Sequence, residues 1–431
     1  MPLKEFALPL LPLNTHLSNI LTGDGWLLFA TRSMRMFAYG FLSVVLVLYL
    51  TAEGLSEKEI GFLLTMTLLG DTAISLWITT AADRIGRKRM LILGAILMAT
   101  AGAVFVLTND FLFLVVAATI GVLSPSDKEV GPFLAIEQAA LSQTIEDGQR
   151  TAVFAWYNLV GSVTAALGAL VGGFACQEFL RVGVTGAAVY RPLVVAYAIV
   201  GVLLAVGFMF LSRAAELPKT EKPPEHQLWL GLHRSRAVVL RLSALFALDA
   251  FGGGFILQSI VAYWFYIRFH LDPALLGTIF FVANLLAAAS ALAAVSLAKR
   301  FGLIKTMVFT HLPSNVLLIL VPLMPNLTLA VGVLLIRFAI SQMDVPTRQS
   351  YTMAVVHPDE RSAASGITTV ARSIGAALSP TLAGYLLADP RFISVPFFIA
   401  GGVKIFYDLL LYRAFVAQAP AQRGAASEKQ P

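Results

Sequence analysis

A short basic turn between two long apolar runs constrains this chain more than any other feature. The turn, residues 82–89, reads Ala-Asp-Arg-Ile-Gly-Arg-Lys-Arg, with apolar runs at about residues 60–81 before it and 90–107 after it. At 1.5 Å per residue, a helix of about 20 residues crosses the hydrocarbon core of a bilayer. The two runs therefore predict a helical hairpin that crosses a membrane and returns. Because Lys and Arg near span ends resist translocation, the four cations of the turn predict that it is cytoplasmic.

The same arrangement returns in the second part of the chain. Residues 299–305 read Lys-Arg-Phe-Gly-Leu-Ile-Lys between two further apolar runs, and Gly302 follows Gly86 by 216 residues. Residues 147–152 also match residues 358–363, at an offset of 211. Two offsets that differ by only five residues predict duplicated halves, an architecture frequent among secondary transporters.

The basic turn carries a family resemblance. Asp-Arg-x-Gly-Arg-Lys between the second and third apolar runs resembles the signature loop of the major facilitator superfamily, which usually has a degenerate copy between spans eight and nine. Thr79 stands where that family normally has a glycine, and Lys299 stands where the second copy would have its aspartate. The resemblance covers about residues 26–412. It implies an all-α polytopic membrane protein with twelve transmembrane helices in two pseudo-symmetric six-helix halves.

Composition supports a membrane protein with many spans. Hydrophobic residues make up 58% of the 431 residues and charged residues 13%, whereas soluble domains carry about 25% charged residues. The net charge of +6 would suggest nucleic-acid binding in a soluble protein, but here the cations cluster in turns on one expected face. Cys176 is the single cysteine, and the histidines show no metal-ligand spacing. We therefore expect no cofactor, no metal and no nucleic-acid partner.

Polar stretches divide the chain into five parts. Residues 212–236 are rich in proline and charge and predict a cytoplasmic linker. We expect an N-terminal cytoplasmic segment at 1–25, two six-helix halves at 26–211 and 237–412, and a cytoplasmic tail at 413–431. The expected location is a cell membrane, crossed many times, with both termini in the cytoplasm, and the expected state is a monomer.

Polar residues inside the spans are the candidates for function, because a charge in a bilayer costs roughly 2.5 to 3.5 kcal/mol on insertion scales. The resemblance implies that spans one, four, seven and ten line a central cavity. The residues that this places around a substrate are Arg35, Asp127, Lys128, Glu129, Asp249, Gln258, Arg337 and Asp344. Structural ion pairs between helices are the alternative interpretation of each charge.

Proton coupling needs a carboxylate that can load and release a proton near neutral pH, which desolvation favours. Asp249 and Glu129 are the two candidates. Asp249 is the first choice, because Lys128 could keep its neighbour Glu129 ionised. The alternative for Asp249 is a permanent salt bridge to Arg35 or Arg337.

Two contacts are expected between spans two and eleven, which face each other in this family. The first is a gate at the signature loop, formed by Asp83, Arg84, Gly86 and Arg87. Asp83 would lie against residues 362–364, where the first backbone N–H groups of span eleven favour an anion. The second is a pair between Asp71 and Arg372 near the middle of the membrane, because both lie a similar distance from the cytoplasmic end.

These features predict a secondary active transporter and not an enzyme. No Gly-x-x-x-x-Gly-Lys-Ser/Thr loop for ATP is present, and no nucleophile–base set is visible in the spans. Residues 168–173 resemble the end of an antiporter motif, with Ala169 in place of its proline. We expect proton-coupled export (antiport) of a small polar or anionic solute by alternating access, with the solute, protons and the lipid bilayer as partners. The alternatives are proton-coupled uptake (symport) of an organic anion and, less favoured, a non-transporting membrane sensor.

Overall fold

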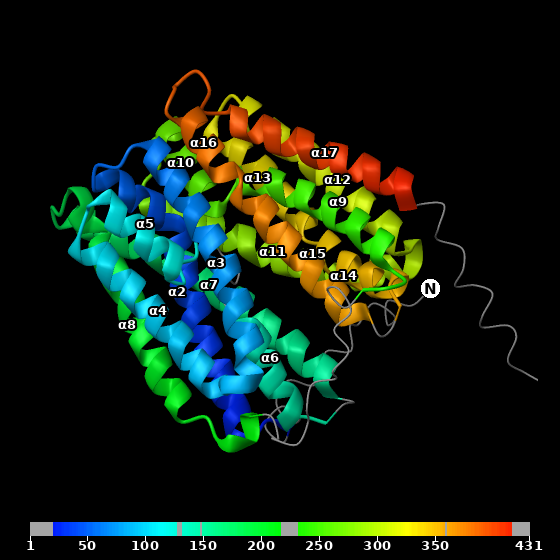
Figure 1. Ribbon diagram of the computed structural model, residues 1–431. Coiled ribbons are helices and arrows are strands. Elements are labelled where there is room, and N and C mark those ends of the chain that lie inside the picture. Colours follow the sequence, from blue (N-terminus) through cyan, green and yellow to red (C-terminus); the bar gives the residue numbers. More distant parts are fainter. Residues whose placement is uncertain (1–19, 127–131, 147–148, 217–231, 358–359, 416–431) are drawn as a thin grey trace, which may run out of the picture.

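The computed structural model describes residues 20–126, 132–146, 149–216, 232–357 and 360–415, and the regular elements in these ranges are helices (Figure 1). The first half contains α2 (Gly23–Ala52), α3 (Glu57–Ile85), α4 (Arg87–Leu107), α5 (Phe111–Ile120), α6 (Phe133–Thr144), α7 (Arg150–Arg181) and α8 (Arg191–Met209). The second half contains α9 (Arg236–Gly254), α10 (Gln258–Phe269), α11 (Pro273–Phe301), α12 (Leu303–Leu320), α13 (Leu327–Ser341), α14 (Asp344–Val355), α15 (Arg361–Ala377), α16 (Ser379–Leu387) and α17 (Val395–Phe415). Short 3₁₀ turns are η3 (Gly186–Val189), η4 (Arg213–Ala215) and η6 (Val321–Leu323).

These helices account for the twelve expected spans. Ten stretches of the described chain are long and apolar enough to cross a membrane. The other two expected spans, four and eleven, are each divided into two shorter helices, α5 with α6 and α15 with α16. The all-α polytopic architecture expected from the sequence is confirmed.

Glycine occupies the same place in both basic turns for a backbone reason. Gly86 joins α3 to α4 with φ of 117°, and Gly302 joins α11 to α12 with φ of 87°. Residues with a Cβ rarely adopt these angles, so a helix that must stop and restart within one residue requires glycine there. The glycine is thus the part of the repeat that chain geometry demands.

Two spans are interrupted close to each other. Span four breaks between α5 and α6, and span seven breaks between α9 and α10. The Ser259 N–H donates to the Pro125 carbonyl at 3.3 Å, so the two breaks lie side by side. Irregular backbone at membrane depth survives only where it is buried in protein or lines a cavity. The breaks therefore mark the interior of the bundle.

Pairs of glycines bring the two halves into close contact. A Cβ added at Gly61 of α3 would lie 2.5 Å from the Pro380 carbonyl oxygen and 2.9 Å from the Cα of Gly384 in α16. A Cβ at Gly173 of α7 would lie 2.9 Å from the Cα of Gly277 in α11. Small residues allow transmembrane helices to approach this closely.

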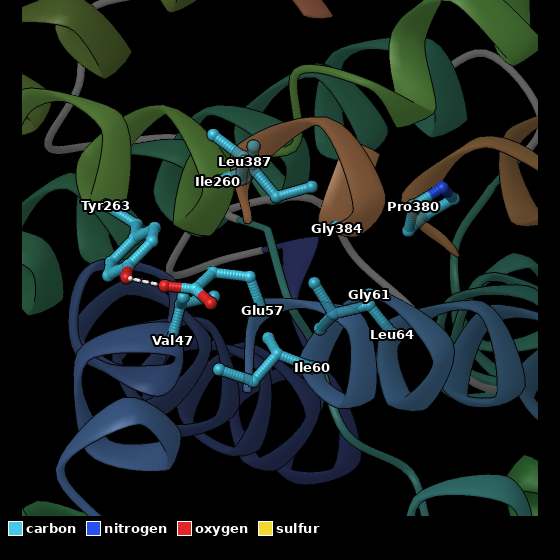
Figure 2. Close-up of a pocket in the computed structure, with 10 residues that line it drawn as sticks. All are labelled: Val47, Glu57, Ile60, Gly61, Leu64, Ile260, Tyr263, Pro380, Gly384 and Leu387. Carbon is cyan, nitrogen blue, oxygen red and sulfur yellow. Dashed lines mark hydrogen bonds between the residues drawn. The ribbon is translucent and has the colours of Figure 1, made fainter. Parts of the chain in front are cut away.

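The halves are closed together at one end of the bundle. We call the end with the turns at Gly86 and Gly302 the basic face, and the other end the opposite face. Side-chain hydrogen bonds between the halves, among the described residues, lie toward the opposite face: Gln258 to Ser43 at 2.7 Å, Tyr263 to Glu57 at 2.8 Å and Thr381 to Thr65 at 2.8 Å. Figure 2 shows this closed end, with Tyr263 and Glu57 beside the Gly61–Gly384 contact. In Figure 1 the halves diverge from it toward the ends of α6 and α14.

Candidate functional site

The first half contains a sealed ion pair. The two terminal nitrogens of Arg35 in α2 each donate to one carboxylate oxygen of Glu137 in α6 at 2.7 Å, and neither side chain is exposed. Tyr157 of α7 donates its hydroxyl to Glu137 Oε2 at 2.6 Å. The Phe133 ring packs under the Arg35 guanidinium at 4.4 Å. A bidentate pair with an extra donor and an aromatic floor holds a buried charge at low cost.

A second arginine lies beside this pair. Arg32 donates to Asn158 Oδ1 at 3.2 Å, and its guanidinium lies 4.3 Å from the Tyr157 ring centre. Gly161 makes the room, because a Cβ there would lie 2.6 Å from Arg32 Nε. Arg32 is therefore a buried residue of the first half.

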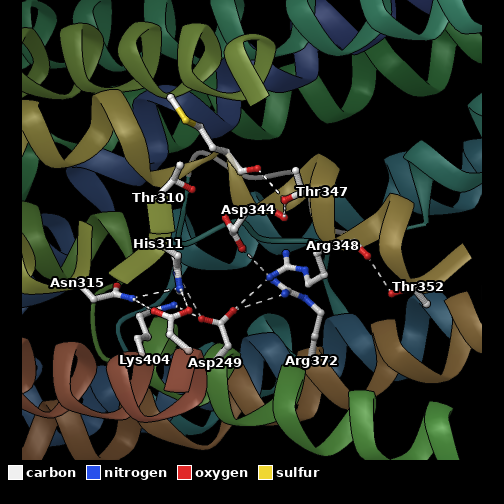
Figure 3. Close-up of polar contacts among 12 residues, drawn as sticks. Asp249, Thr310, His311, Asn315, Asp344, Thr347, Arg348, Thr352, Arg372 and Lys404 are labelled. Carbon is white, nitrogen blue, oxygen red and sulfur yellow. Dashed lines mark hydrogen bonds and ion pairs between the residues drawn. The ribbon is translucent and has the colours of Figure 1, made fainter. Parts of the chain in front are cut away.

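Asp249 is the centre of a larger charge cluster in the second half (Figure 3). Lys404 Nζ of α17 lies 2.6 Å from Asp249 Oδ1. On the other oxygen, Oδ2, Arg348 of α14 lies at 3.3 Å and Arg372 of α15 at 3.6 Å. Arg348 also pairs with Asp344 at 2.9 Å. The carboxylate is nearly inaccessible, whereas the Arg372 side chain is 31% exposed, although its nitrogen that faces Asp249 is buried.

A histidine connects Asp249 to a further acid. His311 of α12 places Nε2 3.7 Å from Asp249 Oδ1 and Nδ1 2.8 Å from Asp408 Oδ1 of α17. Asn315 donates to the other oxygen of Asp408 at 3.1 Å. Asp408 has no exposed surface. One imidazole thus lies between two buried carboxylates.

The predicted cavity residues are distributed unevenly. The cluster includes Asp249 and Asp344, while Arg35 belongs to the sealed pair of the other half. Asp249 pairs with neither of the arginines expected for it, and Arg337, half-buried on α13, places its guanidinium 5.2 Å from the Phe338 ring. Asp127, Lys128 and Glu129 lie outside the described residues.

Gln258 lies at the boundary between the halves. Its amide nitrogen donates to Ser43 Oγ at 2.7 Å, while Ser43 itself donates to the Gly40 carbonyl. Its amide oxygen has no hydrogen-bond partner within the described part of the chain. Gln258 is therefore a buried acceptor at the start of α10.

The gate residues are described only in part. The side chains of Asp83 and Arg84 lie outside the described residues. Arg87 is buried within its own half, where it donates to the carbonyls of Ala139 and Ala215. Arg372 is engaged with Asp249, and its pairing with Asp71 stays a prediction for another conformation.

Five residues of the two clusters were missed by sequence reasoning: Glu137, His311, Arg348, Lys404 and Asp408. One signal was available, because Lys404 and Asp408 are charges one helical turn apart in the middle of a mostly apolar span. Glu137 and Arg348 also lie at matching places of the repeat, 211 residues apart, and a glutamine follows each of them.

Acidic residues also cap helices at the basic face. Glu216 accepts from the backbone N–H groups of Arg87 and Lys88 at 2.7 and 3.0 Å, at the start of α4. Glu360 accepts from the N–H groups of His233, Arg234 and Ser235, which precede α9. Burial would raise the pKa of Glu360, but these hydrogen bonds and that of the Ser235 side chain lower it to about 2.

Comparison with known proteins agrees with this architecture. The chain matches the family model described as Major Facilitator Superfamily at residues 28–380 and 250–431. It is 29% identical over 419 residues to "Uncharacterized membrane protein YJR124C" of Saccharomyces cerevisiae, covering 90% of this chain and 93% of that protein.

Solved structures share the fold at low sequence identity. A mutant form of the nucleoside transporter NupG matches with a TM-score of 0.75 at 12% identity, covering 91% of this chain and 100% of that one. A bacterial homologue of the human lysosomal transporter Spinster, inward-facing and occupied, matches with a TM-score of 0.72 at 16% identity, covering 92% and 98%. A D-xylose–proton symporter matches with a TM-score of 0.68 at 14% identity, covering 90% and 97%. With the family match and the helical fold together, the chain belongs to the major facilitator superfamily, as a multi-pass secondary transporter and not an enzyme.

Proposed function

We propose that this transporter carries a small organic anion together with protons, and that the cluster around Asp249 is where the two are coupled. One observation carries the proposal: three permanent cations, Lys404, Arg348 and Arg372, surround one carboxylate. The most exposed of the three, Arg372, is held by the longest of these ion pairs, 3.6 Å. A solute carboxylate could therefore take the place of Asp249 beside Arg372.

The charge arrangement favours movement of proton and anion in the same direction. While Asp249 is ionised and fully paired, it competes with a solute anion for the same cations. Neutralising the cluster's negative charge by a proton frees part of the positive charge for the solute, so proton and anion strengthen each other's binding. Positive linkage of this kind is the thermodynamic requirement of symport. Proton-coupled symport of an organic anion, one of the alternatives from the sequence, is thus better supported by the geometry than antiport.

Antiport remains the second candidate because of the glycines of α7. A Cβ at Gly168 would lie 2.0 Å from the Phe37 carbonyl oxygen, and one at Gly172 would lie 2.5 Å from the Phe41 Cβ. This part of α7 therefore requires small residues, as the antiporter-like pattern expects. In the antiport interpretation a proton and the solute would compete for the cluster.

The basic face is proposed to be cytoplasmic, with both termini and the linker on that side. The support is the concentration of Lys and Arg in its turns, since such residues stay on the cytoplasmic side. The conformer closed at the opposite face would then be open to the cytoplasm.

Transport into proteoliposomes tests the proposal. The purified protein would be offered radiolabelled lactate, benzoate and succinate under an imposed pH gradient of either sign. Symport predicts accumulation of the anion on the side to which protons flow, and antiport predicts accumulation on the side from which they flow. If none of the three anions accumulates, the organic-anion proposal is wrong.

The variant Asp249→Asn separates coupling from permeation. It should exchange labelled for unlabelled anion but lose accumulation driven by pH, because exchange needs no net proton movement. The control is Asp389→Asn, which alters an exposed ion pair with Arg391 at the opposite face. If Asp249→Asn still accumulates anion against its gradient, the Asp249 cluster is not the coupling site.

A further inference from the structure

The charges around His311 balance when its imidazole is neutral. The acids of the cluster are Asp249 of α9, Asp344 of α14 and Asp408 of α17. The cations are Arg348 of α14, Arg372 of α15 and Lys404 of α17. Within these ion pairs three negative and three positive charges cancel, and Arg337 of α13, which interacts electrostatically with Asp344, is a further cation outside the pairs. His311 is the one remaining group among these whose charge can change near neutral pH in ordinary surroundings.

The hydrogen bonds define which nitrogen of His311 is free to take a proton. Nδ1 lies 2.8 Å from Asp408 Oδ1 and 3.1 Å from the Asn315 amide nitrogen. The amide nitrogen already has an acceptor in Asp408 Oδ2, whereas the ionised carboxylate can only accept, so we assign the hydrogen of the neutral ring to Nδ1. Nε2 then presents a lone pair toward Asp249 Oδ1, and the 3.7 Å separation is too long for a hydrogen bond. A proton added at Nε2 would make this nitrogen an N–H donor that faces the Asp249 carboxylate.

The neighbours of His311 show how protonation of Nε2 would affect the other ion pairs of the cluster. Nε2 faces the same oxygen, Asp249 Oδ1, that Lys404 Nζ contacts at 2.6 Å. An imidazolium there competes with Lys404 for Asp249 Oδ1. It also repels the Lys404 ammonium group, because both carry a positive charge. The Tyr407 ring lies edge-on to His311 at 6.0 Å, and Asn315 holds Asp408 from the far side.

We infer that His311, held by Asp408 and facing Asp249, is the residue that binds the transported proton. The inference rests on the proposed function and deepens it, because the sequence assigned that role to Asp249 or Glu129. On protonation the cluster gains one positive charge, which a solute anion beside Arg372 would balance. One proton therefore recruits one monoanion, and the transport cycle is electroneutral for a monocarboxylate.

The proton site can be tested without knowing the solute. In protein labelled with 15N-histidine and reconstituted into lipid, solid-state NMR would follow imidazole nitrogens from pH 5 to 9. The signal of His311, assigned by its loss in His311→Gln, should change from neutral Nδ1–H to doubly protonated as pH falls. In Asp408→Asn the titration should move to lower pH, because the carboxylate that supports the imidazolium is gone. A His311 ring that keeps one protonation state throughout overturns the inference.

The second test measures transport. Its substrate is the monocarboxylate that the wild type accumulates. His311→Gln should lose pH-driven accumulation and bind the anion more weakly than wild type at low pH. Adding Asp249→Asn to it should restore tight, pH-independent binding, because the competing carboxylate is removed. A potassium diffusion potential should not drive wild-type uptake. His270→Asn, an exposed change at the end of α10, is the control.

The two proposals fail in different ways. If no organic anion is accumulated by wild type, the proposed function fails while the NMR result still decides on the histidine. If wild type is coupled and folded His311→Gln remains coupled, or if uptake responds to voltage, the proposed function stands and the role of His311 is wrong.

Discussion

Glu137 and Arg348 occupy corresponding positions in the two halves and carry opposite charges. They are separated by 211 residues, the offset of the internal repeat, and lie on α6 and α14. Glu137 pairs with Arg35 of the first span, and Arg348 pairs with Asp249 of the seventh. Each half thus contains an ion pair between corresponding helices, but the acid and the base have exchanged places. The first copy is sealed and bidentate, whereas the second is looser and shared with the more exposed Arg372.

Breaking the sealed copy should destabilise the protein strongly. Removing one partner of a buried ion pair leaves an uncompensated charge, so Glu137→Ala should lower the free energy of unfolding by about 3 to 5 kcal/mol. Glu178→Ala, which breaks the exposed pair with Arg181, should cost at most about 1 kcal/mol. Denaturation in mixed micelles would measure both. The double change Arg35→Met with Glu137→Leu should recover most of the loss, and failure to do so would argue against the desolvation explanation.

The glycine contact at the opposite face should control the conformational equilibrium. Gly61→Leu cannot be accommodated against Gly384, so it should open that face. Lys58 and Tyr385 lie in contact across the halves. Double electron–electron resonance between spin labels at these two positions should give a longer distance in Gly61→Leu than in the wild type. Gly332→Leu is the control, since a Cβ at Gly332 meets nothing within 4 Å. Identical distance distributions in Gly61→Leu and Gly332→Leu would show that the Gly61–Gly384 contact does not control opening of this face.

Asp83 is predicted to act when the basic face closes. Its carboxylate would then reach the first N–H groups of α15, a favourable contact of about 0.3 to 1 kcal/mol. Asp83→Asn should reduce transport with expression near normal, whereas Asp83→Glu, which keeps the charge, should retain more activity. Uptake normalised to protein amount in proteoliposomes would show this. Unchanged uptake by Asp83→Asn would show that the gate does not depend on the charge.

In the same closed conformation, Arg372 is predicted to exchange Asp249 for Asp71. Each charge would relieve the burial cost of the other near the middle of the membrane. Asp71→Cys combined with Arg372→Cys should form a disulfide under oxidation when the basic face closes. A structure of every state with the two side chains more than about 8 Å apart, beyond ion-pair range, would refute the pairing.

Glu360 should give the protein an acid-sensitive component of stability. Its pKa is lowered from 4.5 to about 2 by the hydrogen bonds at the start of α9. A depressed carboxyl pKa contributes stability that is complete above the unfolded value and is lost as pH falls toward the folded one. Thermal unfolding of wild type should therefore weaken between pH 4.5 and 2, and Glu360→Gln should lack this component and be less stable at pH 7. Parallel curves for the two proteins would contradict the assignment.

The fold could be predicted because it depends on features that are local in sequence. Apolar runs of bilayer length, basic turns and two matching offsets together determine the number of spans and their duplication. Gly86 and Gly302 add the positions at which helices must stop and restart. None of these features requires knowledge of which helix faces which.

The site was only partly predictable because its residues meet through tertiary contacts. Asp249 was identified from its depth in a span, but its partners Lys404 and His311 lie on spans twelve and nine, which were not expected to line the cavity. Arg35 was placed beside a substrate because the family resemblance implies that span one lines the cavity, although Glu137 seals it inside its own half. Depth in a span follows from sequence, whereas the rotation of a helix about its axis follows from packing.

The partner of Arg35 is made long after Arg35 itself. Glu137 follows it by 102 residues, and at roughly 5 to 20 residues per second a ribosome needs about 5 to 20 seconds to reach it. Asp249 waits about as long, because Arg348, the first of its cationic partners to be synthesised, follows it by 99 residues. During biogenesis the first and seventh spans therefore emerge before these ion-pair partners exist, which favours keeping each span at the translocon, or near the lipid surface, until the later helix arrives. The ion pairs that hold the finished transporter together thus also determine the order in which its helices can leave the insertion machinery.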